Sequence, residues 1–146
     1  MRLLGIVAGA LALVLSSGAQ AQPWISYHSM EDRFAIWFPS EPVIENFEWI
    51  DAHDDARPAR RYTAERDGDV FTVIAIDLTE AEWDVKRAAY PHAATLYRQK
   101  GNVTYDGWAH SDRIDGHRLQ ITQDDGRRLY FVTHFEGDIL YILDAN

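Results

Sequence analysis

Two histidines and two aspartates lie close together in the second half of the chain and could bind a metal ion. They are His110, Asp112, Asp115 and His117. Imidazole nitrogens and carboxylate oxygens suit zinc or copper, and the same groups can act as acid and base. The tight H-x-x-x-H spacing of a helical metal site is missing. We therefore prefer to place these residues beside a turn at Gly116 between two strands, with the metal site as the alternative.

A second cluster of this kind lies at residues 51–55, which include Asp51, His53, Asp54 and Asp55. Their oxygen and nitrogen groups could hold a divalent cation. The segment lacks the glycine and the distal glutamate of an EF-hand loop. Aspartate is also favoured in ordinary turns because it bonds its own backbone. A solvated turn is the preferred interpretation, and a metal site stays open beside it.

Arginines and tryptophans supply the candidates for ligand or partner binding. Arg57, Arg60 and Arg61 form a local basic group in an acidic chain. Alternation along a strand places Arg60 and Arg61 on opposite faces. These arginines could bind an anionic partner or pair with nearby acidic residues, and we prefer the ion pairs because such pairs are common at surfaces. Trp49 and Trp108 could line a binding groove or pack strands together.

Other catalytic signatures are missing from the sequence. The chain has no cysteine, which excludes disulfides, thiolate metal sites and cysteine nucleophiles. It has no G-x-S-x-G elbow and no glycine-rich loop for phosphates or dinucleotides. We expect a non-enzymatic binding or accessory module without a cofactor, acting on an unknown protein or small ligand. The alternative is a metal-dependent periplasmic hydrolase that uses one of the two clusters described above.

The N-terminal segment and the net charge of the chain indicate its cellular location and the partners it could bind. Residues 1–21 combine Arg2, an apolar run at 3–15 and the small residues Ala19 and Ala21, which is the layout of a secretory signal. The apolar run is shorter than the roughly 20 residues that span a bilayer. We expect cleavage there, no stable membrane anchor, and a periplasmic or secreted single domain at 22–146. The net charge of −9 repels phosphate backbones, so nucleic acid is not an expected partner.

The pattern of apolar residues predicts an α+β domain. Alternation predicts strands at 34–38, 43–50 and 60–65, with a charged loop at 51–58. Residues 70–76 are apolar on both faces, which predicts a central strand that is covered on both sides.

One helix is expected to follow. It would begin at Thr79, with Glu82 completing a capping box. Pro91 should kink this helix or divide it in two. The stripe that faces the sheet would consist of Trp83, Tyr90, Ala94 and Tyr97.

Four further strands are predicted at residues 103–109, 117–123, 127–136 and 139–143. The turns at 124–126 and 136–138 indicate antiparallel hairpins. The last strand is apolar on both faces, so the helix or another chain must cover Leu140 and Ile142. A homodimer through this C-terminal strand, or an exposed apolar patch at these two residues, would follow if the helix does not.

Residues 34–42, with the sequence Phe-Ala-Ile-Trp-Phe-Pro-Ser-Glu-Pro, resemble a strand of small exported bacterial proteins related in fold to the PsbP and Mog1 group. The motif is F-x-[IV]-x-F-P-x-x-P, and the resemblance covers most of residues 24–143. It implies an antiparallel sheet between helices, an α/β/α arrangement from which the last helix is missing here. PsbP is an accessory subunit of a photosystem and Mog1 binds a GTPase. The resemblance therefore implies a binding role and transfers no catalytic residue.

Overall fold

The computed structural model describes residues 23–111 and 114–146, so the predicted signal at 1–21 lies outside it. In chain order the described elements are β1 (Ile25–Ser29), β2 (Phe34–Phe38), β3 (Val43–Ile50), β4 (Ala56–Arg66), β5 (Asp69–Asp77), α1 (Trp83–Arg98), β6 (Asn102–Ser111), β7 (Ile114–Thr122), β8 (Arg128–Glu136) and β9 (Ile139–Ala145). Within these ranges, no helix is both long and apolar enough to cross a membrane.

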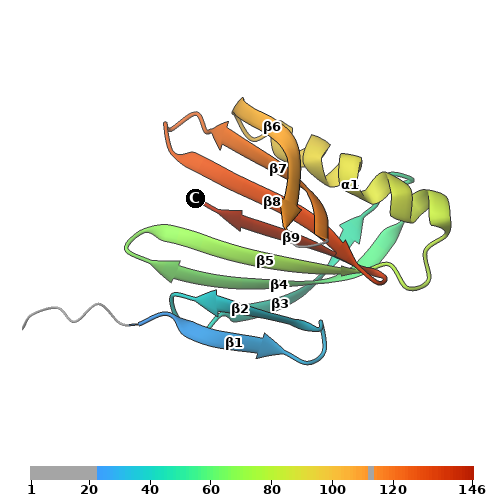
Figure 1. Ribbon diagram of the computed structural model, residues 1–146, viewed down its shortest axis with the longest axis horizontal. Coiled ribbons are helices and arrows are strands. Elements are labelled where there is room, and N and C mark those ends of the chain that lie inside the picture. The colour runs from blue at the N-terminus through green and yellow to red at the C-terminus, as the bar shows by residue number, and fades with distance from the viewer. Residues whose placement is uncertain (1–22, 112–113) are drawn as a thin grey trace, which may run out of the picture.

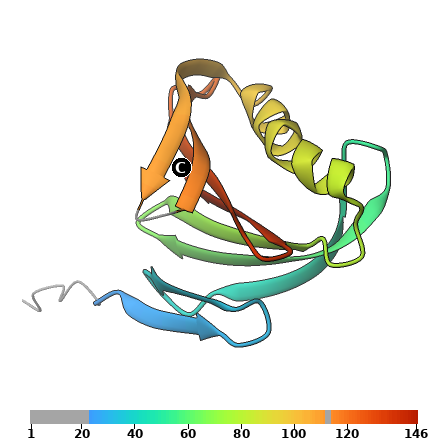
Figure 2. The same ribbon diagram turned by 45° about the vertical axis from the view of Figure 1, so that its right-hand side comes forward.

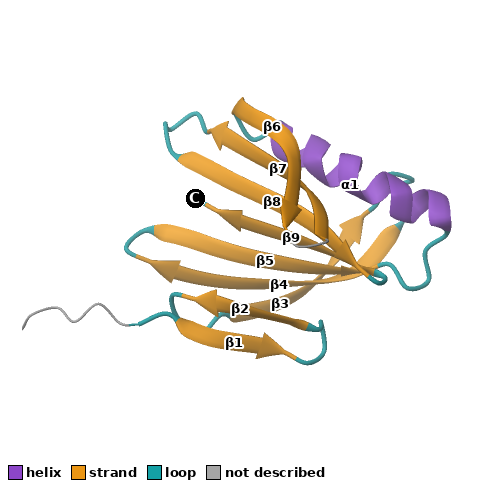
Figure 3. Ribbon diagram, viewed as in Figure 1, coloured by secondary structure: helices purple, strands orange, loops and turns teal. Residues whose placement is uncertain are grey.

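Seven strands form one antiparallel sheet in the order β3-β4-β5-β9-β8-β7-β6, and β1 and β2 form a separate hairpin. Figure 1 shows α1 along one face of the sheet and the hairpin beside β3 and β4, and Figure 3 shows how far strands dominate the fold. The expected α+β class, with an antiparallel sheet and one helical crossover, is confirmed. In the described residues the second covering layer is the β1–β2 hairpin, so the α/β/α layering is not formed there.

The two central strands, β5 and β9, are buried on both faces. Ile76, Leu140 and Ile142 pack under α1, whereas Val73 and Tyr141 face the hairpin side of the sheet. The prediction of a central strand at 70–76 is therefore confirmed. Leu140 and Ile142 are 0% and 2% exposed, so the helix covers them and the alternative of an exposed apolar patch does not arise. Both edges of β9 are paired, with β5 and β8, which leaves this strand no free edge for a dimer.

The helix begins later than predicted. Its N-cap is Glu82, with no side-chain cap, and the capping box at Thr79 does not form. The reason is local: the backbone N–H of Thr79 donates to Asp77 Oδ1 at 2.9 Å, which ends β5 in a turn. The helix is not divided at Pro91, since one helix runs through it. Proline has no N–H, so Pro91 cannot donate a hydrogen bond to the carbonyl of Arg87, one turn earlier in the helix. Both residues are exposed, so water can bond that carbonyl instead.

Small residues bring α1 close to the sheet. The buried helix positions are Val85, Ala89, Ala93, Ala94 and Tyr97. The predicted stripe is therefore right for Ala94 and Tyr97. It is wrong for Trp83, which is 76% exposed. Tyr90 is half-buried and packs on Phe135 with ring centroids 5.4 Å apart.

Two further corrections concern strand ends. Gly116 lies inside β7 and not in a turn. A Cβ at this position would sit 2.2 Å from the Thr133 carbonyl oxygen of β8, so the position requires glycine. Its role is close approach between strands. The loop predicted at 51–58 is shorter, since β4 already includes Pro58 opposite Glu48 of β3. Pro58 precedes the first residue that pairs with β5, Ala59, so its missing N–H breaks no ladder on that side.

Asp32, in the turn between β1 and β2, fixes the hairpin to the sheet. Its carboxylate accepts hydrogen bonds from Arg60 Nε at 2.8 Å and from the Tyr62 hydroxyl. Its backbone carbonyl accepts from the Tyr141 hydroxyl at 2.6 Å. Burial, together with the Asp32 carboxylate, raises the pKa of Tyr62 to about 12. The Tyr62 hydroxyl therefore stays protonated and keeps its role as a donor at neutral pH.

Replacing Asp32 by Ala should lower the free energy of unfolding by about 2 kcal/mol, because Arg60 and Tyr62 would lose their shared acceptor in a largely buried place. Urea denaturation followed by circular dichroism would measure this change. Glu48→Ala, which removes an exposed carboxylate from β3, is the control and should change stability by less than about 0.5 kcal/mol. Equal losses in both variants would show that Asp32 does not anchor the hairpin.

Candidate functional site

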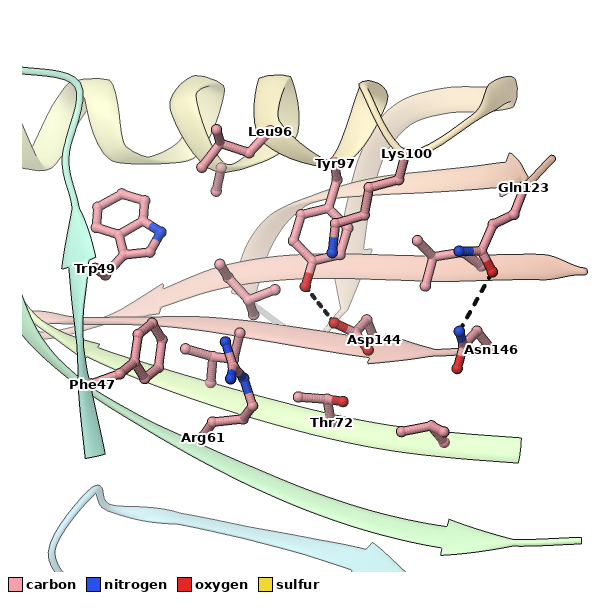
Figure 4. A pocket seen from close by; sticks show the side chains of 15 residues that line it. Phe47, Trp49, Arg61, Thr72, Leu96, Tyr97, Lys100, Gln123, Asp144 and Asn146 are labelled. Carbon is pink, nitrogen blue, oxygen red and sulfur yellow. Dashed lines mark hydrogen bonds between the residues drawn. The ribbon is translucent and has the colours of Figure 1, made fainter. Parts of the chain in front are cut away.

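A cavity of about 440 Å³ lies between α1 and the sheet. The sheet curves around the helix (Figure 2), and α1 makes its main contacts with β7, β8 and β9. The space that remains lies toward β3, β4 and β5, and Figure 4 shows it from close by. Its volume falls within the range of small-molecule sites, roughly 300–1,000 Å³. It is therefore the candidate functional site.

Aromatic and aliphatic side chains form one end of the cavity. Alternation along β3 turns Phe47 and Trp49 to the helix side, where Leu96 of α1 lies toward the same end (Figure 4). Trp49 is only 7% exposed and packs edge-on against His92, with ring centroids 5.3 Å apart. This end offers an apolar surface whose Trp49 is shielded from water, whereas Leu96 is 39% exposed.

A tyrosine and an aspartate form the polar centre of the cavity. The Tyr97 hydroxyl of α1 donates a hydrogen bond to Asp144 of β9 (Figure 4). Burial first, and the Asp144 carboxylate second, raise the pKa of Tyr97. The hydroxyl therefore holds its proton firmly and serves as a fixed donor. Further along, Asn146 Nδ2 donates to Gln123 Oε1 at 3.4 Å.

Two cations flank this centre from opposite walls. The guanidinium of Arg61, on β4, lies 4.6 Å from the centre of the Phe47 ring and pairs with Glu45 at 2.9 Å. The ammonium of Lys100, just beyond α1, lies 3.9 Å from the centre of the Tyr97 ring. Cations are attracted to ring faces in this way.

The structure brings together two of the five predicted binding residues. Trp49 and Arg61 both line the cavity. Arg60 lies on the opposite face of β4, as alternation predicts, and pairs with the acidic turn of the hairpin. Arg57 pairs with the 51–55 loop. Trp108 lies on β6, 67% exposed and outside the cavity.

Three residues of the cavity were missed by sequence reasoning as site residues: Tyr97, Lys100 and Asp144. One signal could have found Asp144. It shares its parity with Leu140 and Ile142, so alternation places a carboxylate on the helix-facing side of an apolar strand. A charge in that position needs a partner, and Tyr97 is the partner.

In the 51–55 loop, Asp51 organises the backbone. Its Oδ1 accepts from the backbone N–H groups of His53 at 2.8 Å and Asp55 at 3.1 Å, and its Oδ2 accepts from Arg57 Nε at 2.7 Å. Burial alone would raise the pKa of Asp51, but these hydrogen bonds outweigh burial and lower it. Among the described side chains, no group of three or more His, Asp or Glu residues is placed to hold a metal ion.

His117 is engaged by neighbours on other elements. Its Nε2 lies 2.6 Å from Asp106 Oδ1, close enough for Nε2–H to donate to the carboxylate. Arg98 Nε donates to the other oxygen, Asp106 Oδ2, at 2.8 Å. The hydrogen bond from Arg98 is the largest cause that lowers the pKa of Asp106. These three side chains tie the end of α1 to β6 and β7.

The other members of the predicted histidine cluster are described only in part. The strands β6 and β7 pair His110 with Asp115 in their backbone register, and the side chains of both lie outside the described part of the chain, as does Asp112. Most of the expected loop is strand, since β6 reaches Ser111 and β7 starts at Ile114. A metal site at these four residues stays a prediction.

Asp51 should contribute to stability in a pH-dependent way. Because its pKa is lowered on folding, the contribution is fully present above the ordinary aspartate pKa of about 3.9. It is lost as the pH falls below that value through the lowered pKa of the folded state. We expect the stability difference between the protein and Asp51→Asn, measured by urea unfolding, to shrink below about pH 4. Asp54→Asn, at an exposed position of the same loop, is the control for the amide substitution, and a difference for Asp51→Asn that is constant with pH would refute the assignment.

His117→Ala tests the metal alternative. With His117 bonded to Asp106, we expect the substitution to lower the free energy of unfolding by about 1 kcal/mol. The metal content of untagged protein, measured by elemental analysis, should not change. Stoichiometric zinc that is lost in His117→Ala would instead establish the metal site and displace the structural role.

Comparison with known proteins gives no match: no family model, no curated protein and no solved structure is similar to this chain. The resemblance of residues 34–42 to the PsbP and Mog1 group stays a prediction. What the molecule does is therefore argued from the cavity under α1 and the side chains around it.

Proposed function

We propose that this protein is an exported, non-enzymatic binding module that holds a small ligand between α1 and the sheet. One observation carries the proposal: a cavity of about 440 Å³ with an aromatic end and a few converging polar groups. Ligand sites commonly combine an apolar lining with a small number of placed polar groups, which fix the orientation of the ligand.

The polar groups of the cavity favour binding over catalysis. Tyr97 and Asp144 are bonded to each other, and the raised pKa of Tyr97 makes it a poor proton donor to a substrate at neutral pH. Arg61 and Lys100 are cations suited to orienting a ligand. This set can position a molecule without supplying a nucleophile and its base.

Two expectations from the sequence agree with this role. The signal-like order of residues 1–21 would place the module in the periplasm or outside the cell. The resemblance of residues 34–42 to the PsbP and Mog1 group, whose named members bind other proteins, also favours binding. Fold analogy is a weak argument for function, so the cavity remains the main support.

A neutral fluorescent dye, N-phenyl-1-naphthylamine, would test whether the cavity binds ligands. We expect saturable binding, one dye per protein, detected by increased emission. Leu96→Trp places a larger side chain in the wall of the cavity. It should weaken dye binding about tenfold or more, because less apolar surface of the dye can then be buried.

The matched control is Thr95→Trp, which adds the same side chain at the neighbouring exposed helix position. Its affinity for the dye should equal that of the unchanged protein. Failure of the dye to bind, or equal weakening in both variants, would refute the cavity as the binding site.

A further inference from the structure

We propose that the ligand of this cavity is an amphipathic anion, with an apolar body and one carboxylate or similar anionic group. This inference rests on the function proposed above and adds the chemical class of the ligand. It follows from the charges at the rim of the cavity, from the groups those charges already contact, and from the separation of apolar and charged walls.

The charged groups that line the cavity are mainly cationic. They are Arg61, Lys100 and Asp144, and Asp144 already accepts the Tyr97 hydroxyl. In a protein with a net charge of −9, this is a local reversal of sign. With two cations and one anion among its lining side chains, the cavity favours a negatively charged ligand.

Both cations can reach an anion at little cost. Lys100 has no carboxylate partner among the described side chains, and its ammonium rests on the Tyr97 ring. Arg61 pairs with Glu45, but their side chains are 39% and 62% exposed. A pair this exposed is weak, roughly 0–1 kcal/mol. Arg61 can therefore exchange Glu45 for an anionic group of a ligand.

A cationic ligand fits the same site poorly, although its aromatic rings could in principle attract one. The faces of Phe47 and Tyr97 are already taken by the chain's own cations, Arg61 and Lys100. A ligand cation at either ring would be repelled by the protein cation already there. The single negative charge of Asp144 could compensate only one of these positive charges. The rings are therefore better used as apolar walls.

The layout of the walls separates the two ends of such a ligand. In Figure 4, Trp49 and Leu96 lie toward one end of the cavity and Lys100 lies toward the other, with Arg61 on the wall opposite the helix. An apolar body would pack against Trp49 and Leu96. Its anionic group would then lie near Lys100, and Arg61, beside Phe47 on the opposite wall, adds a second positive charge to the cavity.

Three probes with the same alkyl chain test the inference: decanoate, 1-decanol and decyltrimethylammonium, titrated by calorimetry below the solubility limit of the alcohol and below the micelle-forming concentrations of the two ionic probes. Decanoate should bind about tenfold more tightly than 1-decanol, and the ammonium probe should bind most weakly, as expected for one partly exposed charge contact. The preference for decanoate should shrink at high salt.

Lys100→Gln should weaken decanoate about tenfold and leave 1-decanol unchanged. Arg61→Gln is the second variant and should act in the same direction. The matched control is Arg87→Gln, which removes an exposed cation of α1 outside the cavity and should leave both affinities unchanged. Thermal melting of each variant would confirm that it folds.

Equal affinity for decanoate and 1-decanol, or a decanoate affinity that Lys100→Gln and Arg61→Gln leave unchanged, would overturn the anionic ligand. If the neutral dye binds and is displaced by 1-decanol in that case, the proposed function stands. If neither the dye nor any of the three probes binds, the proposed function fails with it.

Discussion

The central constraint on this molecule is that β5 and β9 are apolar on both faces, so both faces of the sheet centre must be shielded from water. Ile76 and Leu140 lie beneath α1, and Val73 and Tyr141 lie on the other side. The chain contains one long amphipathic helix in its described part, which covers one face. The other face depends on a two-stranded hairpin that Asp32 holds in place. The rest of the architecture follows from this unequal cover.

One helix is narrower than a seven-stranded sheet, and this difference produces the cavity. Alanines at positions 89, 93 and 94 let α1 approach the sheet closely, and its main contacts are with β7, β8 and β9. The strands on the other side, β3 and β4, are left to curve up beside the helix (Figure 2). The space between them is lined by side chains from both sides, including Trp49, Arg61 and Tyr97.

Local patterns predicted the elements well because they depend on short-range alternation. The strands at 34–38 and 43–50 were placed correctly, and Trp49 and Arg61 were recognised as candidates for binding. Local rules failed where two of them compete or where distant segments meet. Asp77 accepts the hydrogen bond from the Thr79 backbone N–H that the capping box would have used. The glycine at 116 is required by the close approach of β8 and not by a turn. The pairing of Tyr97 with Asp144, 47 residues apart, depends on how the helix lies on the sheet.

The tryptophans are distributed in a way that matters for spectroscopy. Trp49 is 7% exposed, whereas Trp24, Trp37, Trp83 and Trp108 are 41%, 62%, 76% and 67% exposed. Four of the five indoles already meet solvent in the native state, so their emission changes little when the chain unfolds. We expect a blue-shifted component of the intrinsic fluorescence from Trp49, which lies beside His92. The change in emission wavelength on unfolding is therefore expected to come mainly from Trp49, at the junction between β3 and the helix.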